Sequence, residues 1–194
     1  MSGSDALLKS ARLAFARSGF EATSVREIAR RADVNPALVA HHFGSKEELW
    51  LAVVDQIAER TALLRELTGA LRSSGLAPRR RVEQALVLFV DEVFSEPDIG
   101  MFFSTAATEQ GERLNVLVDR LVRPYHEVFV PLLADAMDAG ELLRNDPTVV
   151  FAMLTNAVSK TVAYRHVLSA FSPIIEQSET FKRAVIDAAF NMLH

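Results

Sequence analysis

The chain has 194 residues, of which 49% are hydrophobic, and a formal net charge of −4. It is long enough for one domain, or for a small domain joined to a larger one with a substantial core. It contains no cysteine, which excludes disulfides and thiolate metal sites.

The start of the chain is polar (MSGSD), and its longest apolar runs are too short to cross a bilayer. We therefore expect a cytoplasmic protein with no membrane partner. Residues 1–50 hold seven Lys/Arg and six Asp/Glu, for a net +1, and the remainder holds fourteen and nineteen, for a net −5. This balance argues against indiscriminate nucleic-acid binding, so any DNA contact must come from a few locally placed cations. The candidates are Arg26, Arg30, Arg31 and Lys46.

The first predicted helix begins at Ser4 or Asp5 and is capped by Gly19, with Phe20 folding back on its last turn. Two short helices follow between Thr23 and Leu49. The spacing of Ser24 and Glu27 predicts a capping box that opens the first of them. A turn at residues 33–34 ends it.

The second short helix has clear boundaries. Asn35 is its predicted cap, and Pro36 occupies the first position, where the missing N–H has no effect. Gly44 ends the helix, and a capping box at Ser45 and Glu48 opens the next one. Two helices with so short a turn must cross steeply, which is the geometry of a helix-turn-helix that places its second helix in the major groove of DNA. A buried helical hairpin with a solvated outer face is the alternative.

A helix of ~26 residues, ~39 Å long, is predicted from Lys46 to about Leu71, and it could link two domains. Pro124 and Pro131 are expected to kink a later helix or to open a gap in its hydrogen bonds. No segment alternates with a period of two, so we predict an all-α fold. The later predicted helices cover Arg79–Phe94, Asp98–Ala107, Leu114–Ala139, Pro147–Phe171 and Pro173–Leu193.

The segments TSVREIARRA, VNPALV and HHFGSKEEL resemble the DNA-binding part of the TetR family of bacterial transcriptional regulators, over Ala6 to Trp50. Asp33 stands where the family usually has Gly, and Ala40 where it often has Tyr. The resemblance implies a three-helix helix-turn-helix domain at residues 1–48. A long helix would join it to a helical ligand-binding and dimerisation domain at residues 49–194.

Eight residues are predicted to contact double-stranded operator DNA. Those expected at phosphates are Thr23, Ser24 and Lys46. The candidates for base edges are Arg26 and His41. The small residues that permit close approach, and contact with a thymine methyl group, are Pro36 and Ala37. The remaining residue, His42, is open to two interpretations, a phosphate contact or packing.

The second domain mixes large apolar residues with a few polar ones, and the resemblance implies a pocket there for a small, largely apolar effector. Ordinary core packing is the alternative for each residue. The predicted pocket residues are Phe89, Met101, Phe102, Thr105, Tyr125, His126, Phe129, Phe151 and Asn156.

The last two predicted helices are apolar over more than one stripe, which is typical of helices buried on two sides. A second copy of the chain could cover the second side, giving a homodimer whose recognition helices are ~34 Å apart. A fully buried central helix is the alternative. The predicted interface residues are Phe151, Leu154, Val158, Val185, Ala189 and Met192.

The resemblance therefore implies a sequence-specific DNA-binding regulator, by default a repressor released from its operator by a ligand. An all-α enzyme, or a scaffold that does not bind DNA, is the alternative. The five histidines lack metal-site spacing, and the sequence has no Gly-rich phosphate loop. We accordingly predict no catalytic residue, no metal and no cofactor.

Overall fold

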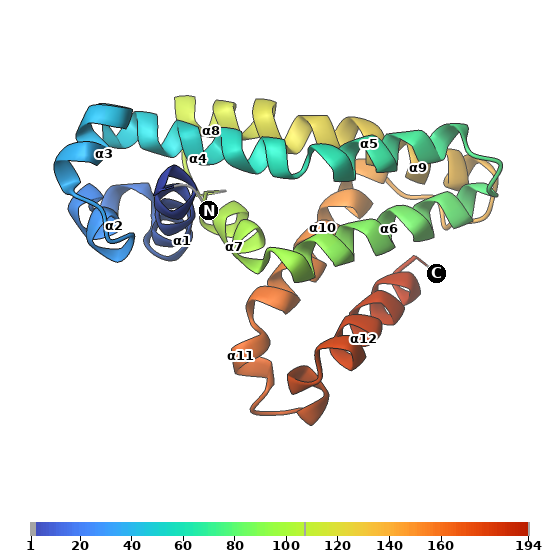
Figure 1. The fold of residues 1–194 in the computed structure, drawn as a ribbon. Helices are drawn as coiled ribbons and strands as arrows, with labels where there is room; N and C mark the ends of the chain where they lie inside the picture. Colours follow the sequence, from blue (N-terminus) through green and yellow to red (C-terminus); the bar gives the residue numbers. More distant parts are fainter. Residues whose placement is uncertain (1–2, 107, 194) are drawn as a thin grey trace. The chain divides into compact units, whose positions relative to one another are not determined.

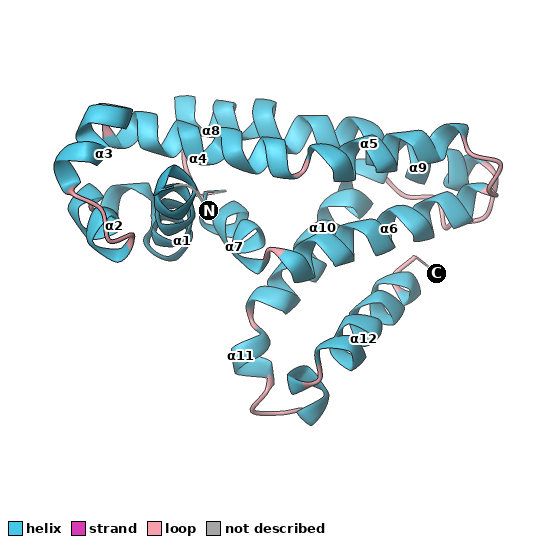
Figure 2. Ribbon diagram, in the orientation of Figure 1, coloured by secondary structure: helices cyan, strands magenta, loops and turns pink. Residues whose placement is uncertain are grey.

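The computed structural model describes residues 3–106 and 108–193, apart from the side chains of residues 3, 4 and 38. Every regular element in these ranges is helical (Figure 2). Within the described residues there is no strand, so the predicted all-α class is confirmed. None of the helices in these ranges is long and apolar enough to cross a membrane.

The chain folds as two compact units, each built from two separate stretches of sequence. We call them the N-terminal unit (Met1–Arg60 and Asp98–Leu121) and the C-terminal unit (Thr61–Pro97 and Val122–His194). The predicted functional division into 1–48 and 49–194 stays a prediction. The segment Asp98–Leu121, from the middle of the sequence, packs in the same unit as the helix-turn-helix.

In the N-terminal unit the predicted cap at Gly19 is confirmed, because this residue has φ 74° and ψ 175° inside an otherwise helical stretch. Glycine adopts that conformation without the steric penalty of other residues. The helices of this unit are α1 (Gly3–Ala22), α2 (Val25–Arg31), α3 (Pro36–Phe43), α4 (Lys46–Arg60), α7 (Pro97–Ala106) and α8 (Glu112–Leu117) (Figure 1).

Trp50 is at the centre of the N-terminal core and is 1% exposed. Its ring meets Phe20 edge-on at a centroid distance of 6.4 Å and lies 6.2 Å from the ring of Phe102 in α7. Thr105, also in α7, donates a hydrogen bond of 2.6 Å to the carbonyl oxygen of Ala16 in α1. α7 therefore completes the core beneath the helix-turn-helix.

A buried ion pair also joins α1 to α7. Arg12 Nε lies 2.6 Å from Asp98 Oδ2, and the two side chains are only 1% and 13% exposed. A guanidinium removed from water to this degree is tolerated only when a carboxylate compensates its charge. The pair therefore fixes the start of α7 against the middle of α1.

The C-terminal unit packs α6 against α9 and α12, and α9 against α5 and α10. Its core is apolar and draws on these helices, with Leu86, Phe129, Leu133, Leu154 and Phe181 among its buried residues. Its elements are α5 (Ala62–Ala70), η1 (Leu71–Ser73), α6 (Pro78–Ser95), α9 (Arg123–Asp138), α10 (Pro147–Ala163), α11 (Arg165–Leu168), η3 (Pro173–Glu176) and α12 (Ser178–Asn191).

Four predicted helices are interrupted. The helix predicted from Lys46 to Leu71 divides at Thr61, whose ψ of 1° departs from the helical value. The helix predicted from Pro147 to Phe171 ends at Ala163, and α11 follows after Tyr164. The helix predicted from Leu114 to Ala139 is disturbed before Pro124, where the π-helical segment η2 (Val118–Val122) lies, whereas α9 continues as a helix through Pro131. The last of them, predicted from Pro173 to Leu193, divides at Gln177, whose extended backbone separates η3 from α12. One end of the predicted helix Asp98–Ala107 lies outside the described residues.

Candidate nucleic-acid interface

The turn between α2 and α3 is built on a left-handed residue. Asp33 has φ 54° and is, among the described residues, the non-glycine residue with a positive φ. Short polar side chains tolerate this conformation better than most others. The Val34 N–H then donates to the Ala29 carbonyl oxygen at 3.0 Å, which closes the turn as the sequence predicted.

The predicted boundaries of the second short helix are confirmed. The Asn35 side chain accepts a hydrogen bond of 2.9 Å from the Ala37 N–H, Pro36 occupies the first turn, and Gly44 ends the helix with φ 72°. Val39 anchors the inner face at 1% exposure. The outward residues Pro36, Ala37, Ala40, His41 and His42 are all exposed. This face therefore points to solvent, and the major groove of DNA is wide enough to admit an α-helix.

The predicted capping boxes are formed only in part. Ser24 occupies the cap position of α2, but its side chain makes no cap hydrogen bond, and Glu27 pairs instead with Arg31 at 2.7 Å. At the start of α4, Ser45 Oγ accepts a hydrogen bond of 3.1 Å from the Glu48 N–H. The exposed Ser24 hydroxyl therefore does not cap its own helix.

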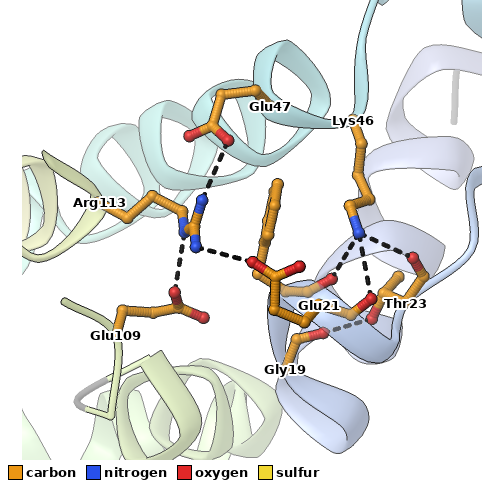
Figure 3. Close-up of polar contacts among 8 residues, drawn as sticks. Gly19, Glu21, Thr23, Lys46, Glu47, Glu109 and Arg113 are labelled. Atoms are coloured by element: carbon orange, nitrogen blue, oxygen red, sulfur yellow. Dashed lines mark hydrogen bonds and ion pairs between the residues drawn. The ribbon is translucent and has the colours of Figure 1, made fainter. Parts of the chain in front are cut away.

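Two of the residues predicted at phosphates point inward. Thr23 is 7% exposed, and its hydroxyl donates to the Gly19 carbonyl oxygen at 2.6 Å. Lys46 Nζ donates to the carbonyl oxygens of Phe20, Glu21 and Thr23 at 2.9, 3.2 and 3.3 Å (Figure 3). These bonds use all three donors of the ammonium group and neutralise the carbonyl-rich end of α1. Both side chains thus stabilise the platform that carries α3.

The other predicted contacts lie at the surface. Ser24 and Arg26 are exposed at the start of α2, and the four predicted residues of α3 are exposed as described above. The rings of His41 and His42 are 5.6 Å apart and nearly edge to face. Arg30 is also exposed on α2. The roles of the eight residues toward DNA stay predictions, with Thr23 and Lys46 already engaged inside the chain.

The predicted pocket residues are divided between the two units. Met101, Phe102 and Thr105 belong to α7 and the N-terminal unit. The structure brings five others together in the C-terminal unit, where ring centroids of neighbouring members lie 5.4 to 5.9 Å apart. We call this group, Phe89, Tyr125, His126, Phe129 and Phe151, the aromatic cluster. Asn156 is exposed and donates to the Ala152 carbonyl oxygen on its own helix.

Most residues predicted for a dimer interface face the core of their own chain. Five of the six are buried there, and only Met192 is substantially exposed, at 47%. The helical stripe chosen from sequence is thus the inner one. The buried residues are Phe151, Leu154, Val158, Val185 and Ala189. Homodimer formation itself stays a prediction.

Sequence comparison places the helix-turn-helix in a known group. Residues 7–53 match the model of the family described as bacterial regulatory proteins, tetR family. The HTH-type transcriptional regulator BetI of Rhizobium meliloti is 33% identical over 142 residues, which cover 71% of this chain and 68% of that protein. The HTH-type transcriptional repressor NicS of Pseudomonas putida is 27% identical over 173 residues, covering 86% and 79%.

Solved structures share the fold. HlyIIR, a hemolysin II transcriptional regulator, superposes with a TM-score of 0.71 at 22% identity, covering 96% of each chain. A TetR-like transcriptional regulator from Rhodococcus sp. RHA1 gives a TM-score of 0.68 at 20% identity, covering 98% of this chain and 93% of that one.

The helical fold of the described residues, with the exposed second helix of a helix-turn-helix, and the similarity to HTH-type regulators together define the class of DNA-binding transcriptional regulators. Within that class, the chain belongs to the TetR family. It is therefore a regulator that binds operator DNA, and the alternative of an all-α enzyme is set aside by this membership.

Proposed function

We propose that this chain represses transcription as a homodimer and is released from its operator by a small, neutral, largely apolar molecule bound in the C-terminal unit. The observation that carries the proposal is the aromatic cluster, together with two buried hydroxyl groups beside it. Repression is also the activity named for NicS, which is similar over most of both chains.

The aromatic cluster is centred on Tyr125, whose ring is stacked on Phe89 at 5.6 Å and contacts Phe129 and Phe151 at 5.6 and 5.9 Å. His126 meets Phe151 edge-on, and its Nε2 lies 3.0 Å from Thr148 Oγ1. Such rings favour planar apolar ligands, because offset and edge-on contacts add to the burial of apolar surface.

Two hydroxyl groups supply the polar part of the proposed site. Those of Thr68 and Tyr125 are both buried, and neither makes a hydrogen bond of standard geometry within the described residues. Burial raises the pKa of Tyr125, and the nearby Thr68 hydroxyl lowers it in smaller measure. A buried hydroxyl without a full partner destabilises the protein, so a ligand that offers one gains affinity there. The same burial disfavours an anionic ligand.

Dimer formation is supported by the outer faces of the last long helices. α10 exposes Val149 and Met153 at 55% and 58%, and Met192, which directly follows α12, is exposed as well. Large apolar side chains exposed in succession on one helix face are typical of an interface. A twofold contact through these faces would present two copies of α3 to successive major grooves. Ligand binding can abolish that match only if the ligand prefers the non-binding form.

The experiment uses a DNA fragment selected by the purified protein from a random pool, and a panel of aromatic molecules that carry a single hydroxyl or carbonyl group. We expect at least one compound to release the retarded fragment. The variant Tyr125→Phe should still retard the DNA but need more compound for release. Tyr164→Phe, which alters the chain's other, exposed tyrosine, is the matched control. Compounds that bind without releasing DNA would contradict the proposal.

A further inference from the structure

Arg113, near the start of α8, gathers three carboxylates from separate parts of the N-terminal unit (Figure 3). Its Nε donates to Glu109 at 2.8 Å, its Nη2 to Glu21 at 3.1 Å and its Nη1 to Glu47 at 3.3 Å. Glu21 lies at the end of α1, and Glu47 in the first turn of α4. One guanidinium thus holds together three segments that are up to 92 residues apart in sequence.

The ring of Phe20 lies at the same place. Arg113 Cζ is 4.0 Å from the ring centre, and Lys46 Nζ is 4.4 Å from it. Cations over an aromatic face are attracted by its electrons, most strongly where water is excluded. Phe20 also stacks on Phe15 and contacts Trp50, so the charged group rests directly on the core.

The three carboxylates do not contribute equally. Glu109 is 12% exposed, whereas Glu47 is 45% and Glu21 is 82% exposed. Water screens an exposed pair, and its contribution is small. The bond to Glu109 is therefore the strongest of the three and anchors Arg113, which in this position also contacts Glu47 in the first turn of α4.

The first turn of α4 is the point from which α3 is held. α3 ends at Phe43, Gly44 and Ser45 form the link, and the Ser45 N–H donates to the Phe43 carbonyl oxygen at 2.8 Å. In a link this short, a shift of the start of α4 relative to α1 must move α3. Hydrogen bonds to base edges require that α3 be held within about 1 Å of the position it takes on DNA.

We propose that Arg113 is a positioning residue for DNA recognition, which fixes the start of α4 against the end of α1 and so orients α3. The segment around Glu109 and Arg113 then acts as a clamp on the helix-turn-helix, although it follows it by more than sixty residues in sequence. Arg113 itself does not touch DNA in this proposal. It acts through Glu47, Lys46 and the α3–α4 link.

The test compares two substitutions with opposite effects on charge. Arg113→Gln removes a positive charge, and Glu109→Gln removes a negative one. If charge alone mattered, Arg113→Gln would weaken DNA binding and Glu109→Gln would tighten it, on every sequence. If Arg113 positions α3, both substitutions should weaken binding to the selected operator by about three- to tenfold. The affinity for non-specific DNA should change only by the amount that the altered net charge causes.

The double variant sharpens the result. Because both substitutions break one contact, their effects on operator affinity should not add, and the double variant should be no weaker than the worse single variant. Arg113→Lys keeps the charge over Phe20 but loses the forked hydrogen bonds, so it should restore part of the affinity. The pair Arg144 and Asp138, 2.8 Å apart and exposed in the C-terminal unit, is the matched control. The same changes of charge there should leave operator affinity unchanged.

Fluorescence of Trp50, the chain's single tryptophan, reports whether the N-terminal core is intact in each variant. If Arg113→Gln fails to fold, Glu109→Gln and Arg113→Lys decide the matter. Operator affinities that follow net charge, or additive effects in the double variant, would overturn the proposal.

Discussion

The ammonium nitrogen of Lys46 lies 2.9 Å from the carbonyl oxygen of Phe20 and 4.4 Å from the centre of its ring. The sequence predicts a phosphate contact for this lysine, but its donors already serve the end of α1. We therefore expect Lys46→Ala to lower the free energy of unfolding by about 1–2 kcal/mol. Operator binding should weaken because α3 loses support, whereas the slope of affinity against salt should stay the same.

That slope is the deciding measurement. If Lys46 contacts a phosphate, the substitution should flatten the slope by about one unit. A slope flattened in this way would show that Lys46 binds DNA directly. Lys160 is a useful comparison, because its ammonium lies 5.9 Å from the centre of the Tyr164 ring in the C-terminal unit. Lys160→Ala should affect neither the slope nor operator affinity.

The left-handed turn before α3 offers a second prediction. Asp33 has φ 54°, a region that glycine enters freely and side chains with a Cβ enter at a cost. Asp33→Gly should therefore raise the free energy of unfolding by about 0.5–1 kcal/mol, and Asp33→Val should lower it by about 1 kcal/mol. Urea denaturation followed by Trp50 fluorescence would measure both changes. If the two variants are as stable as the natural chain, the backbone at Asp33 is not strained.

The buried pair of Arg12 and Asp98 yields a third prediction. Removing the carboxylate breaks the 2.6 Å ion pair of a guanidinium that is only 1% exposed. Asp98→Ala should lower the free energy of unfolding by about 3 kcal/mol. Asp138→Ala, which breaks an exposed pair, should change it by less than about 0.5 kcal/mol. A similar small effect of both substitutions, measured by chemical denaturation, would show that Arg12 does not depend on α7.

The helix-turn-helix could be predicted from sequence because its signals are local. Asn35, Pro36 and Gly44 mark the ends of α3 through their own backbone preferences, and the structure places them as expected. The Arg113 cluster left no such signal, since its partners at Glu47 and Glu21 are 66 and 92 residues away. The division at Thr61 also falls between ordinary helix formers, without Gly or Pro.

The dimer residues show a different limit of sequence reasoning. α10 and α12 are apolar on more than one side, so periodicity alone cannot distinguish the stripe that faces the core from the outer one. The sequence predicts Leu154 and Val185 at the interface, but the structure places them inside the C-terminal core. The large apolar residues exposed on α10, Val149 and Met153, are the ones that a second copy would meet in the proposed dimer.

Stability at low pH provides a fourth prediction. Burial opposes the charge of Glu83, but hydrogen bonds from Arg79 and Arg80, with their positive charges, outweigh it and hold the pKa of Glu83 below its usual value. A carboxylate with a lowered pKa stabilises the folded chain at every pH above the unfolded value of about 4.3. That contribution disappears as the pH falls through the lower, folded value.

Glu83→Gln should therefore reduce stability at neutral pH, and the difference from the natural chain should shrink only below about pH 4. Thermal unfolding between pH 3 and pH 7 would measure it. A difference that is the same over this whole range would mean that Glu83 acts through packing rather than through its charge.

The outer face of α10 carries the fifth prediction. Met153 is 58% exposed and one turn from Val149, which is 55% exposed. If a second copy covers this face, Met153→Glu buries an unpaired charge at the contact and should weaken dimerisation at least about tenfold. Sedimentation over a range of concentrations would measure this shift. Leu143→Glu, at a residue 65% exposed beyond α9, is the control and should leave the dimer intact.

Because one copy presents a single α3, the Met153 variant should also lose operator affinity at concentrations where it is monomeric. A variant that stays dimeric would place the twofold contact on another face of the C-terminal unit.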